Sequence, residues 1–166
     1  FNTTNLDAMS DSGKVLMTAL MLVGGSPGST AGGMKTTTVA VLFLAAITVF
    51  GRKKDVKCLD RRLPEDVVRN SGAIFFIYMA LFIASAAIIS RIENLPILTC
   101  LFETGSAIGT VGLTLGITTS LSLPSRIILI FLMFFGRLGG LTMIYAALPS
   151  GSAEATKMPL EKITVG

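Results

Sequence analysis

Residues 72–90 have the sequence GAIFFIYMALFIASAAIIS and contain no charged side chain. As one helix this stretch would be roughly 28 Å long, close to the ~30 Å hydrocarbon core of a bilayer. Residues 127–148 form a second apolar stretch, which only Arg137 interrupts. Core helices of a soluble domain are the alternative interpretation, but a chain of 166 residues could hardly enclose two such segments. The sequence therefore predicts an all-α integral membrane protein in contact with the lipid bilayer.

Between these two stretches the sequence pattern changes. Residues 95–108 would form a helix of roughly 20 Å, too short to span a bilayer, with Pro96 suited to its first turn. The next residues, GTVGLTLG at 109–116, are glycine-rich and β-branched, so we expect them not to be helical. A short helix followed by extended backbone between two spans is the outline of a re-entrant pore loop.

A second glycine-rich segment, GGSPGSTAGG at residues 24–33, interrupts the apolar region from residue 15 to residue 50. One straight helix over this region would be roughly 54 Å long, far more than a bilayer needs. The glycines and Pro27 would also cost such a helix on the order of 8 kcal/mol relative to alanine. We therefore expect two helical pieces joined by an irregular loop, called the glycine-rich loop below. At membrane depth such backbone is tolerated only inside protein or beside a water-filled cavity, so the loop indicates a transport pathway.

Half of the 14 lysine and arginine residues lie in the segment 51–70. By the positive-inside rule this basic loop faces the cytoplasm, and by parity of crossings so does the tail, residues 150–166. A nucleic-acid surface is the alternative, but acidic residues are interspersed and no aromatic side chain is present, so we expect no nucleic acid as a partner. The basic residues of this loop are Arg52, Lys53, Lys54, Lys57, Arg61, Arg62 and Arg69.

The tetrapeptide Gly109-Thr110-Val111-Gly112 resembles the Thr-Val-Gly core of potassium-channel filters, in which carbonyl rings replace the hydration shell of the ion. Glycine lets successive carbonyls turn toward one axis, and a β-branched neighbour stiffens the strand. The C-terminal end of the preceding helix, near Ile108, carries the negative end of the helix dipole and favours a cation. We expect K⁺ to bind the backbone carbonyls of Thr110, Val111 and Gly112.

Three ionisable residues lie within apolar stretches: Lys35, Glu103 and Arg137. A charge near mid-span costs roughly 2.5–3.5 kcal/mol on insertion scales, so Arg137 should face the protein interior and bind carbonyls of the glycine-rich loop or Glu103. Lys35 has two interpretations, extension of its side chain to the inner boundary or a role in gating. Glu103 is either a hydrogen-bond anchor for the short helix or an ion site, and we favour the anchor.

The chain also contains a weak internal repeat. Residues 14–25 align without a gap on residues 126–137, and the same offset places Phe1 on Leu113, directly after the filter residue Gly112. We therefore expect the sequence to be a piece of a longer protein that begins just past another filter glycine. Repeats of this kind suit a pore on the axis between them.

Enzymatic chemistry has little support in this sequence. Histidine is absent, and we find no paired carboxylates on one face and no nucleophile–base set. Cys58 and Cys100 lie in unlike surroundings, which argues against a disulfide or a metal site. The string GSTAGGMKT departs from a phosphate-binding loop because Met34 separates Gly33 from Lys35. We expect no enzyme and no bound cofactor.

Three segments resemble the Ktr branch of the Trk/Ktr/HKT potassium transporters: GGSPGSTAGGMKTTT at residues 24–38, FETGSAIGTVGLTLGIT at 102–118 and FLMFFGRLGGLTM at 131–143. The initial Phe-Asn-Thr is also similar to the residues just after the third filter of that family, whereas Met34 stands where isoleucine is common. The resemblance implies helix–pore-loop–helix repeats around a central pore. The four parts would be the end of the third repeat at 1–50, the cytoplasmic loop at 51–70, the fourth repeat at 71–149 and the cytoplasmic tail at 150–166.

The same resemblance implies potassium uptake across the bacterial plasma membrane, often stimulated by sodium. It also implies a homodimer of a multi-pass subunit on a cytosolic nucleotide-binding regulatory ring. The filter would comprise Gly109, Thr110, Val111, Gly112 and Leu113, with Phe1 and Asn2 from the preceding repeat. Residues 24–38 would form an intramembrane gate beneath the filter, with Arg137 as its partner. The gate residues would be Gly24, Gly25, Ser26, Pro27, Gly28, Ser29, Thr30, Ala31, Gly32, Gly33 and Lys35.

One alternative function stays open at this point. A secondary transporter with a discontinuous helix could bind a substrate or an ion at the membrane midplane. It would explain the glycine-rich loop equally well, but it leaves the short helix and the Gly-Thr-Val-Gly segment without a purpose.

Overall fold

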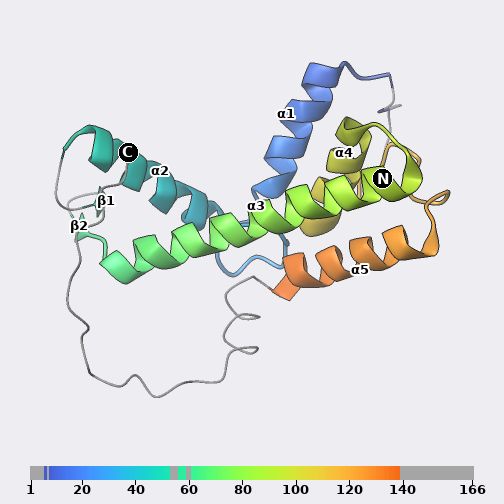
Figure 1. Ribbon diagram of the computed structural model, residues 1–166. Coiled ribbons are helices and arrows are strands. Elements are labelled where there is room, and N and C mark those ends of the chain that lie inside the picture. Colours follow the sequence, from blue (N-terminus) through green and yellow to red (C-terminus); the bar gives the residue numbers. More distant parts are fainter. Residues whose placement is uncertain (1–5, 7, 53–55, 59–60, 139–166) are drawn as a thin grey trace, which may run out of the picture.

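The computed structural model describes residue 6 and residues 8–52, 56–58 and 61–138. These residues form five helices and one small hairpin (Figure 1). The predicted filter residues Phe1 and Asn2, the end of the last predicted span and the tail lie outside the described residues. The elements are α1 (Asp11–Leu22), α2 (Thr36–Phe50), β1 (Lys57–Cys58), β2 (Arg61–Arg62), α3 (Glu65–Glu93), α4 (Ile97–Ile108) and α5 (Leu123–Leu138).

The long helix α3 organises the molecule. It has 29 residues, and within the described part of the chain it alone is both long and apolar enough to cross a bilayer. In Figure 1, α2 lies along its first half, while α1, α4 and α5 gather around its second half. The predicted span 72–90 lies entirely inside α3, and only 28% of the most apolar 18-residue window is buried within the chain.

The start of α3 differs from the prediction. The helix begins at Glu65, inside the segment 51–70 that we expected to be a loop. Pro64 in extended conformation precedes the helix, and Glu65 and Asp66 in its first turn complement the positive end of the helix dipole. The hairpin of β1 and β2, in which Lys57 pairs with Arg62, occupies another part of the segment 51–70. This segment is therefore part hairpin and part helix.

Helix α4 is the short helix that the sequence predicts before the filter segment. It is 12 residues long, follows Pro96 and contacts α1, α3 and α5. Every residue from Phe102 to Ile108 is buried. Its 12 residues make a helix of roughly 18 Å, shorter than the ~30 Å hydrocarbon core of a bilayer.

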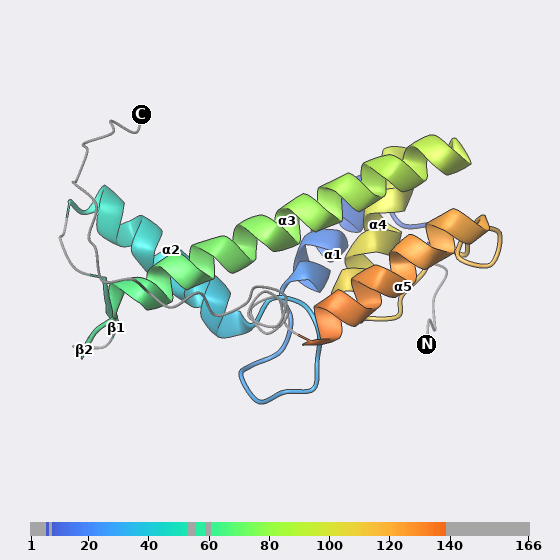
Figure 2. The same cartoon turned by 60° about the horizontal axis from the view of Figure 1, so that its bottom comes forward.

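The predicted break in the first apolar region is confirmed. Helix α1 ends at Leu22 and α2 begins at Thr36. The two ends of the connection are closed by backbone hydrogen bonds, from Gly24 N to Met34 O at 2.6 Å and from Met34 N to Leu22 O at 3.1 Å. In Figure 2 the connection is the blue loop that hangs between α1 and α2 beside the end of α5.

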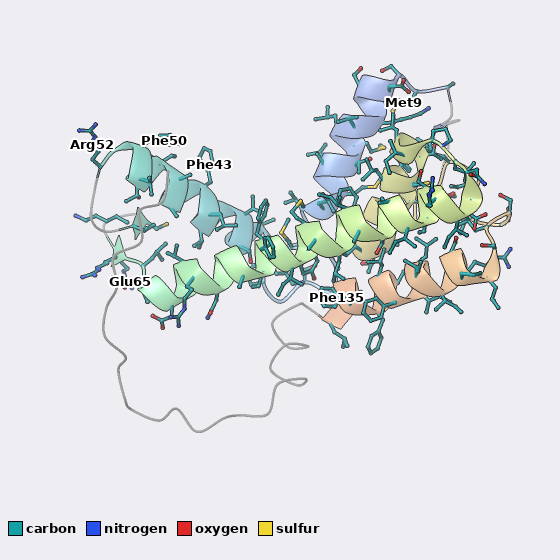
Figure 3. All side chains as sticks on the ribbon, in the orientation of Figure 1. Met9, Phe43, Phe50, Arg52, Glu65 and Phe135 are labelled. Atoms are coloured by element: carbon teal, nitrogen blue, oxygen red, sulfur yellow. The ribbon has the colours of Figure 1, made fainter. Side chains whose placement is uncertain are left out.

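Large apolar side chains cover much of the outer surface. Helix α2 buries Thr48 alone, while Phe43 is 67% exposed and Phe50 is 87% exposed. Figure 3 shows both phenylalanines projecting away from the helix pair, and it places Arg52 and Glu65 at the same end of the molecule. An outer surface this apolar is suited to lipid or to further helices of the same kind.

Candidate functional site

The predicted filter segment, residues 109–113, leaves the buried end of α4 as non-helical backbone. Gly109 is still right-handed, whereas Thr110 has φ +52° and Gly112 has φ +83°. Thr110 N donates to Ala107 O at 3.0 Å and Val111 N donates to Ser106 O at 2.9 Å. The last turn of α4 therefore holds the first residues of the segment, and the left-handed conformation at Gly112 explains the need for glycine there.

Glu103 holds the residues that follow the filter segment. Its side chain is buried, with only 4% of the residue exposed. Its carboxyl oxygens accept hydrogen bonds from Thr114 Oγ1 at 2.5 Å, from Leu115 N at 2.9 Å and from Thr118 Oγ1 at 2.9 Å. Of the two roles considered from the sequence, this geometry matches the anchor, because α4 is tied through Glu103 to the backbone behind the filter segment.

The glycine-rich loop is held by two cationic side chains. Lys35 Nζ donates to Ser29 O at 3.0 Å and to Ala31 O at 2.8 Å, and Arg137 Nη1 donates to the carbonyl of Thr30 between them. Three successive loop carbonyls therefore each accept from a cation. Of the two partners that the sequence offered for Arg137, the structure selects the loop carbonyls, and Lys35 binds its own loop.

Filter segment and loop touch each other directly. Gly32 N donates to Thr110 Oγ1 at 2.9 Å across 78 positions of sequence. A groove of about 410 Å³ lies beside this contact and is lined by residues of both segments. Its lining includes Gly109, Thr110, Val111 and Leu113 of the predicted filter and Gly24, Gly25, Ala31 and Gly32 of the predicted gate, but not Gly112 or Lys35.

Gly136 on α5 is a site residue that the sequence reasoning did not single out. A Cβ atom at Gly136 would overlap the carbonyl oxygen of Ile108 at the end of α4. The carbonyl of Gly136 also accepts a hydrogen bond from Gly33 N at 3.3 Å. Helix α5 therefore packs backbone to backbone against both α4 and the loop, and the alignment of Gly136 with Gly24 in the internal repeat was the available signal.

A second carboxyl group, that of Glu93, joins the C-terminal end of α3 to the N-terminal end of α5. Glu93 Oε1 accepts hydrogen bonds from Ser122 N at 2.9 Å, from the hydroxyl of Ser122 and from Ser125 Oγ at 2.5 Å. These donors lie just before and within the first turn of α5, where backbone N–H groups have no helical partner. The contact fixes the start of α5 relative to α3.

A comparison with protein families matches residues 1–156 to TrkH, a family described as cation transport proteins. The chain belongs to the TrkH family of cation transport proteins. All three segments that resemble this family lie within the matched range, so the prediction made from them is confirmed.

The curated relatives of this TrkH chain include uptake proteins from three bacteria. Potassium/sodium uptake protein NtpJ of Enterococcus hirae is 37% identical over 164 residues, which cover 95% of this chain and 36% of the relative. Ktr system potassium uptake protein B of Vibrio alginolyticus is 37% identical over 145 residues, covering 87% and 32%. Ktr system potassium uptake protein D of Bacillus subtilis is 34% identical over 164 residues, covering 99% and 36%. The chain spans about a third of the length of these relatives.

A solved structure has the same fold. The crystal structure of the potassium transporter TrkH from Vibrio parahaemolyticus matches this chain with a TM-score of 0.73 at 24% sequence identity. The match covers 90% of this chain and 34% of that protein. The helices described here are therefore arranged as in a TrkH-type transporter.

Proposed function

We propose that the full-length protein moves potassium across the bacterial plasma membrane, with residues 109–113 as one side of its filter and residues 24–38 as its gate. The direct contact of the two segments, from Gly32 N to Thr110 Oγ1, is the observation that carries the proposal. The names of the relatives support potassium as the ion, and the name of NtpJ adds sodium as an ion that is taken up.

In the proposed filter, backbone carbonyls of Thr110, Val111 and Gly112 replace part of the hydration shell of K⁺. Gly112 is exposed in this chain, and the space beside its Cα is open. We infer that this open side faces the pore axis, where Leu113 and the residues Phe1 and Asn2 of the preceding repeat would complete the ring. The negative end of the α4 dipole favours a cation at the same place.

In the proposed gate, the glycine-rich loop blocks the pathway on the cytoplasmic side of the filter. Arg137 and Lys35 hold the loop by its carbonyls at Ser29, Thr30 and Ala31. Opening then requires the loop to leave Arg137, which projects from α5, and to leave Thr110. Glycines make such movement easy because they add no side chain that must be repacked.

The wider assembly is part of the same proposal. Residues 1–50 would end the third repeat and residues 71–149 would form the fourth, within a multi-pass subunit with four repeats around the pore. The basic loop 51–70 and the tail 150–166 would face the cytoplasm, in reach of a nucleotide-binding regulatory ring, and the subunit would form a homodimer. The Ktr relatives are named as members of a system, which supports a regulatory partner.

Potassium-limited growth of an uptake-deficient strain tests the proposed filter. The full-length protein should restore growth, and Gly112→Ser should lower its preference for potassium over sodium because a side chain disturbs the carbonyl ring. Gly116→Ser is the matched control, since Gly116 has φ +90° and equally open space but lies outside the ring. Unchanged selectivity in Gly112→Ser, at normal membrane abundance, would remove the filter assignment.

The gate has its own test in the same strain. Shortening residues 24–38 of the full-length protein should raise potassium flux, because the obstruction beneath the filter is then smaller. Equal flux at equal membrane abundance would leave the loop with a structural role only.

A further inference from the structure

A separate cavity of about 190 Å³ lies where α1, α3 and α4 meet. Figure 1 shows these helices around the second half of α3, and α4 contacts both of the others. Among the described residues, none from the filter segment or the glycine-rich loop lines this cavity. Val15 and Ala19 are exposed at its rim, whereas Leu22 and Phe82 are buried at its base. The cavity is therefore open on its outer side and closed toward the protein.

The lining of the cavity offers nothing to a polar ligand. Thr18 is its one residue with a polar side chain, and the hydroxyl of Thr18 already donates to the carbonyl of Lys14 at 2.8 Å. A buried water molecule needs about two to four polar partners, whereas an apolar cavity of about 150 Å³ stays dry and takes up a hydrocarbon. The occupant that this cavity fits is therefore a hydrocarbon.

The length of the cavity matches a lipid chain. Its residues on α1 run from Val15 to Leu22, which is roughly 10 Å along the helix. One leaflet is about half of the ~30 Å hydrocarbon core, or ~15 Å deep. Leu16 and Leu20, which flank the lining residues on α1, are also exposed. The rim thus lies in an apolar surface suited to lipid, where acyl chains are the hydrocarbon at hand.

A cationic residue lies at the N-terminal end of the same face of α1. Because Thr18 bonds to the carbonyl of Lys14, the two residues follow each other one helical turn apart. In the proposed orientation this end of α1 lies in the outer leaflet. A phospholipid whose acyl chain runs along α1 from Val15 to Leu22 has its phosphate at the level of Lys14, and a lysine ammonium binds phosphate as a point charge.

We propose that this cavity holds one acyl chain of a membrane phospholipid, whose phosphate binds Lys14. The lipid lies between α1, which leads into the glycine-rich loop, and α4, which precedes the filter segment, and it fills a space that these helices leave open. The inference rests on the membrane location within the proposed function, but not on the filter or the gate. The selectivity of Gly112→Ser therefore tests the filter independently of this lipid site.

Photochemical labelling of the full-length protein in liposomes identifies the occupant. The probe is phosphatidylglycerol with a diazirine in one acyl chain, mixed at a low fraction into phosphatidylcholine, and labelled peptides are mapped by mass spectrometry. We expect adducts on residues 15–22 of α1 and on Leu98 or Leu101 of α4, which are half-buried and line the cavity. If α4 carries no adduct, side chains from another part of the full-length protein fill the cavity and the proposal is wrong.

Filling the cavity distinguishes a lipid inside it from lipid around the protein. Ala19→Phe places a ring at the rim and should lower the adducts on α4 roughly tenfold, as expected when about two methylenes are no longer buried. Ala87→Phe is the matched control, because Ala87 is exposed on α3 and does not line the cavity. Ala19→Leu replaces the phenylalanine variant if the latter does not reach the membrane. Equal adducts on α4 in the variant and the control would overturn the site.

The phosphate contact has its own variant. Lys14→Gln should lower the labelling of α4 by the same probe roughly fivefold, as expected for one lysine near an anionic membrane surface. Lys14→Arg keeps the charge and should label as the wild type does. Wild-type labelling in Lys14→Gln would refute the contact between Lys14 and the phosphate.

Discussion

Replacement of the buried residue Glu103 by alanine should destabilise the protein more than the same replacement of an exposed carboxylate residue. Glu103→Ala removes the acceptor of three hydrogen bonds, of which one comes from the backbone N–H of Leu115, a residue that is only 6% exposed. A buried N–H left without an acceptor costs about 2 kcal/mol. Thr114 and Thr118 lie 2.8 Å apart and can still bond to each other, so their lost bonds to Glu103 add about 1–2 kcal/mol. The expected total is about 3–4 kcal/mol.

Glu103→Gln should cost only about 1 kcal/mol. Glutamine keeps the oxygen that accepts from Thr114 and Leu115, and its amide can donate to the hydroxyl of Thr118. Glu65→Ala is the matched control at an exposed carboxylate. Its only described ion pair, with Arg62 at 3.7 Å, joins side chains that are 62% and 93% exposed, and such pairs contribute about 0–1 kcal/mol.

Thermal unfolding of the purified full-length protein in detergent measures these differences, and potassium/sodium uptake reports the filter. The unfolding midpoint should fall most for Glu103→Ala, slightly for Glu103→Gln and least for Glu65→Ala. Selectivity for potassium over sodium should be lost only in Glu103→Ala. If Glu103→Ala unfolds at the wild-type temperature and keeps its selectivity, Glu103 does not anchor the filter. If Glu103→Gln unfolds at the same temperature as Glu103→Ala, the loss of hydrogen-bond acceptors is not the cause of the destabilisation.

Two further substitutions test contacts at α5 and the loop. Gly136→Ala places a methyl group against the carbonyl of Ile108 and should lower the unfolding midpoint by the equivalent of about 1–3 kcal/mol. Gly72→Ala is the control, because Gly72 lies inside α3 with open space beside it, and this change should raise the midpoint slightly. Equal midpoints for the two variants would show that α5 does not pack closely on α4. Arg137→Ala removes the donor to the carbonyl of Thr30 and should raise potassium flux at equal membrane abundance, so wild-type flux would exclude Arg137 as a tether of the loop.

The elements of the apolar regions could be predicted from local rules. The predicted short helix 95–108 became Ile97–Ile108, and the predicted break at 24–33 lies between Leu22 and Thr36. Both predictions rest on chain length against bilayer thickness and on the low helix propensity of glycine. The start of α3 at Glu65 was missed because positive charge marked the segment as a loop, although positive charge sets orientation and does not prevent a helix.

The contacts of the site could be predicted only in part. Arg137 had two candidate partners, and no periodicity in the sequence could separate them, because the choice depends on how α5 is rotated. The approach of Gly136 to Ile108 and the bond from Gly32 to Thr110 join backbone to residues far away in the sequence. Glycine that permits close approach has the same sequence signature as glycine that permits a turn, so the repeat alignment could draw attention to Gly136 but could not predict which backbone it contacts.

If residues 24–38 are the gate, the described arrangement is its closed state. The carbonyls of Ser29, Thr30 and Ala31, which could assist a passing cation, already accept from Lys35 and Arg137. Within about 5 Å of either side chain, a potassium ion would also meet roughly 3 kcal/mol of repulsion at an effective dielectric constant near 20. Closure is then electrostatic as well as steric. Neutralising Arg137 while keeping a donor, as in Arg137→Gln, should therefore raise flux nearly as much as Arg137→Ala, whereas a gate that works by obstruction alone would stay closed in the glutamine variant.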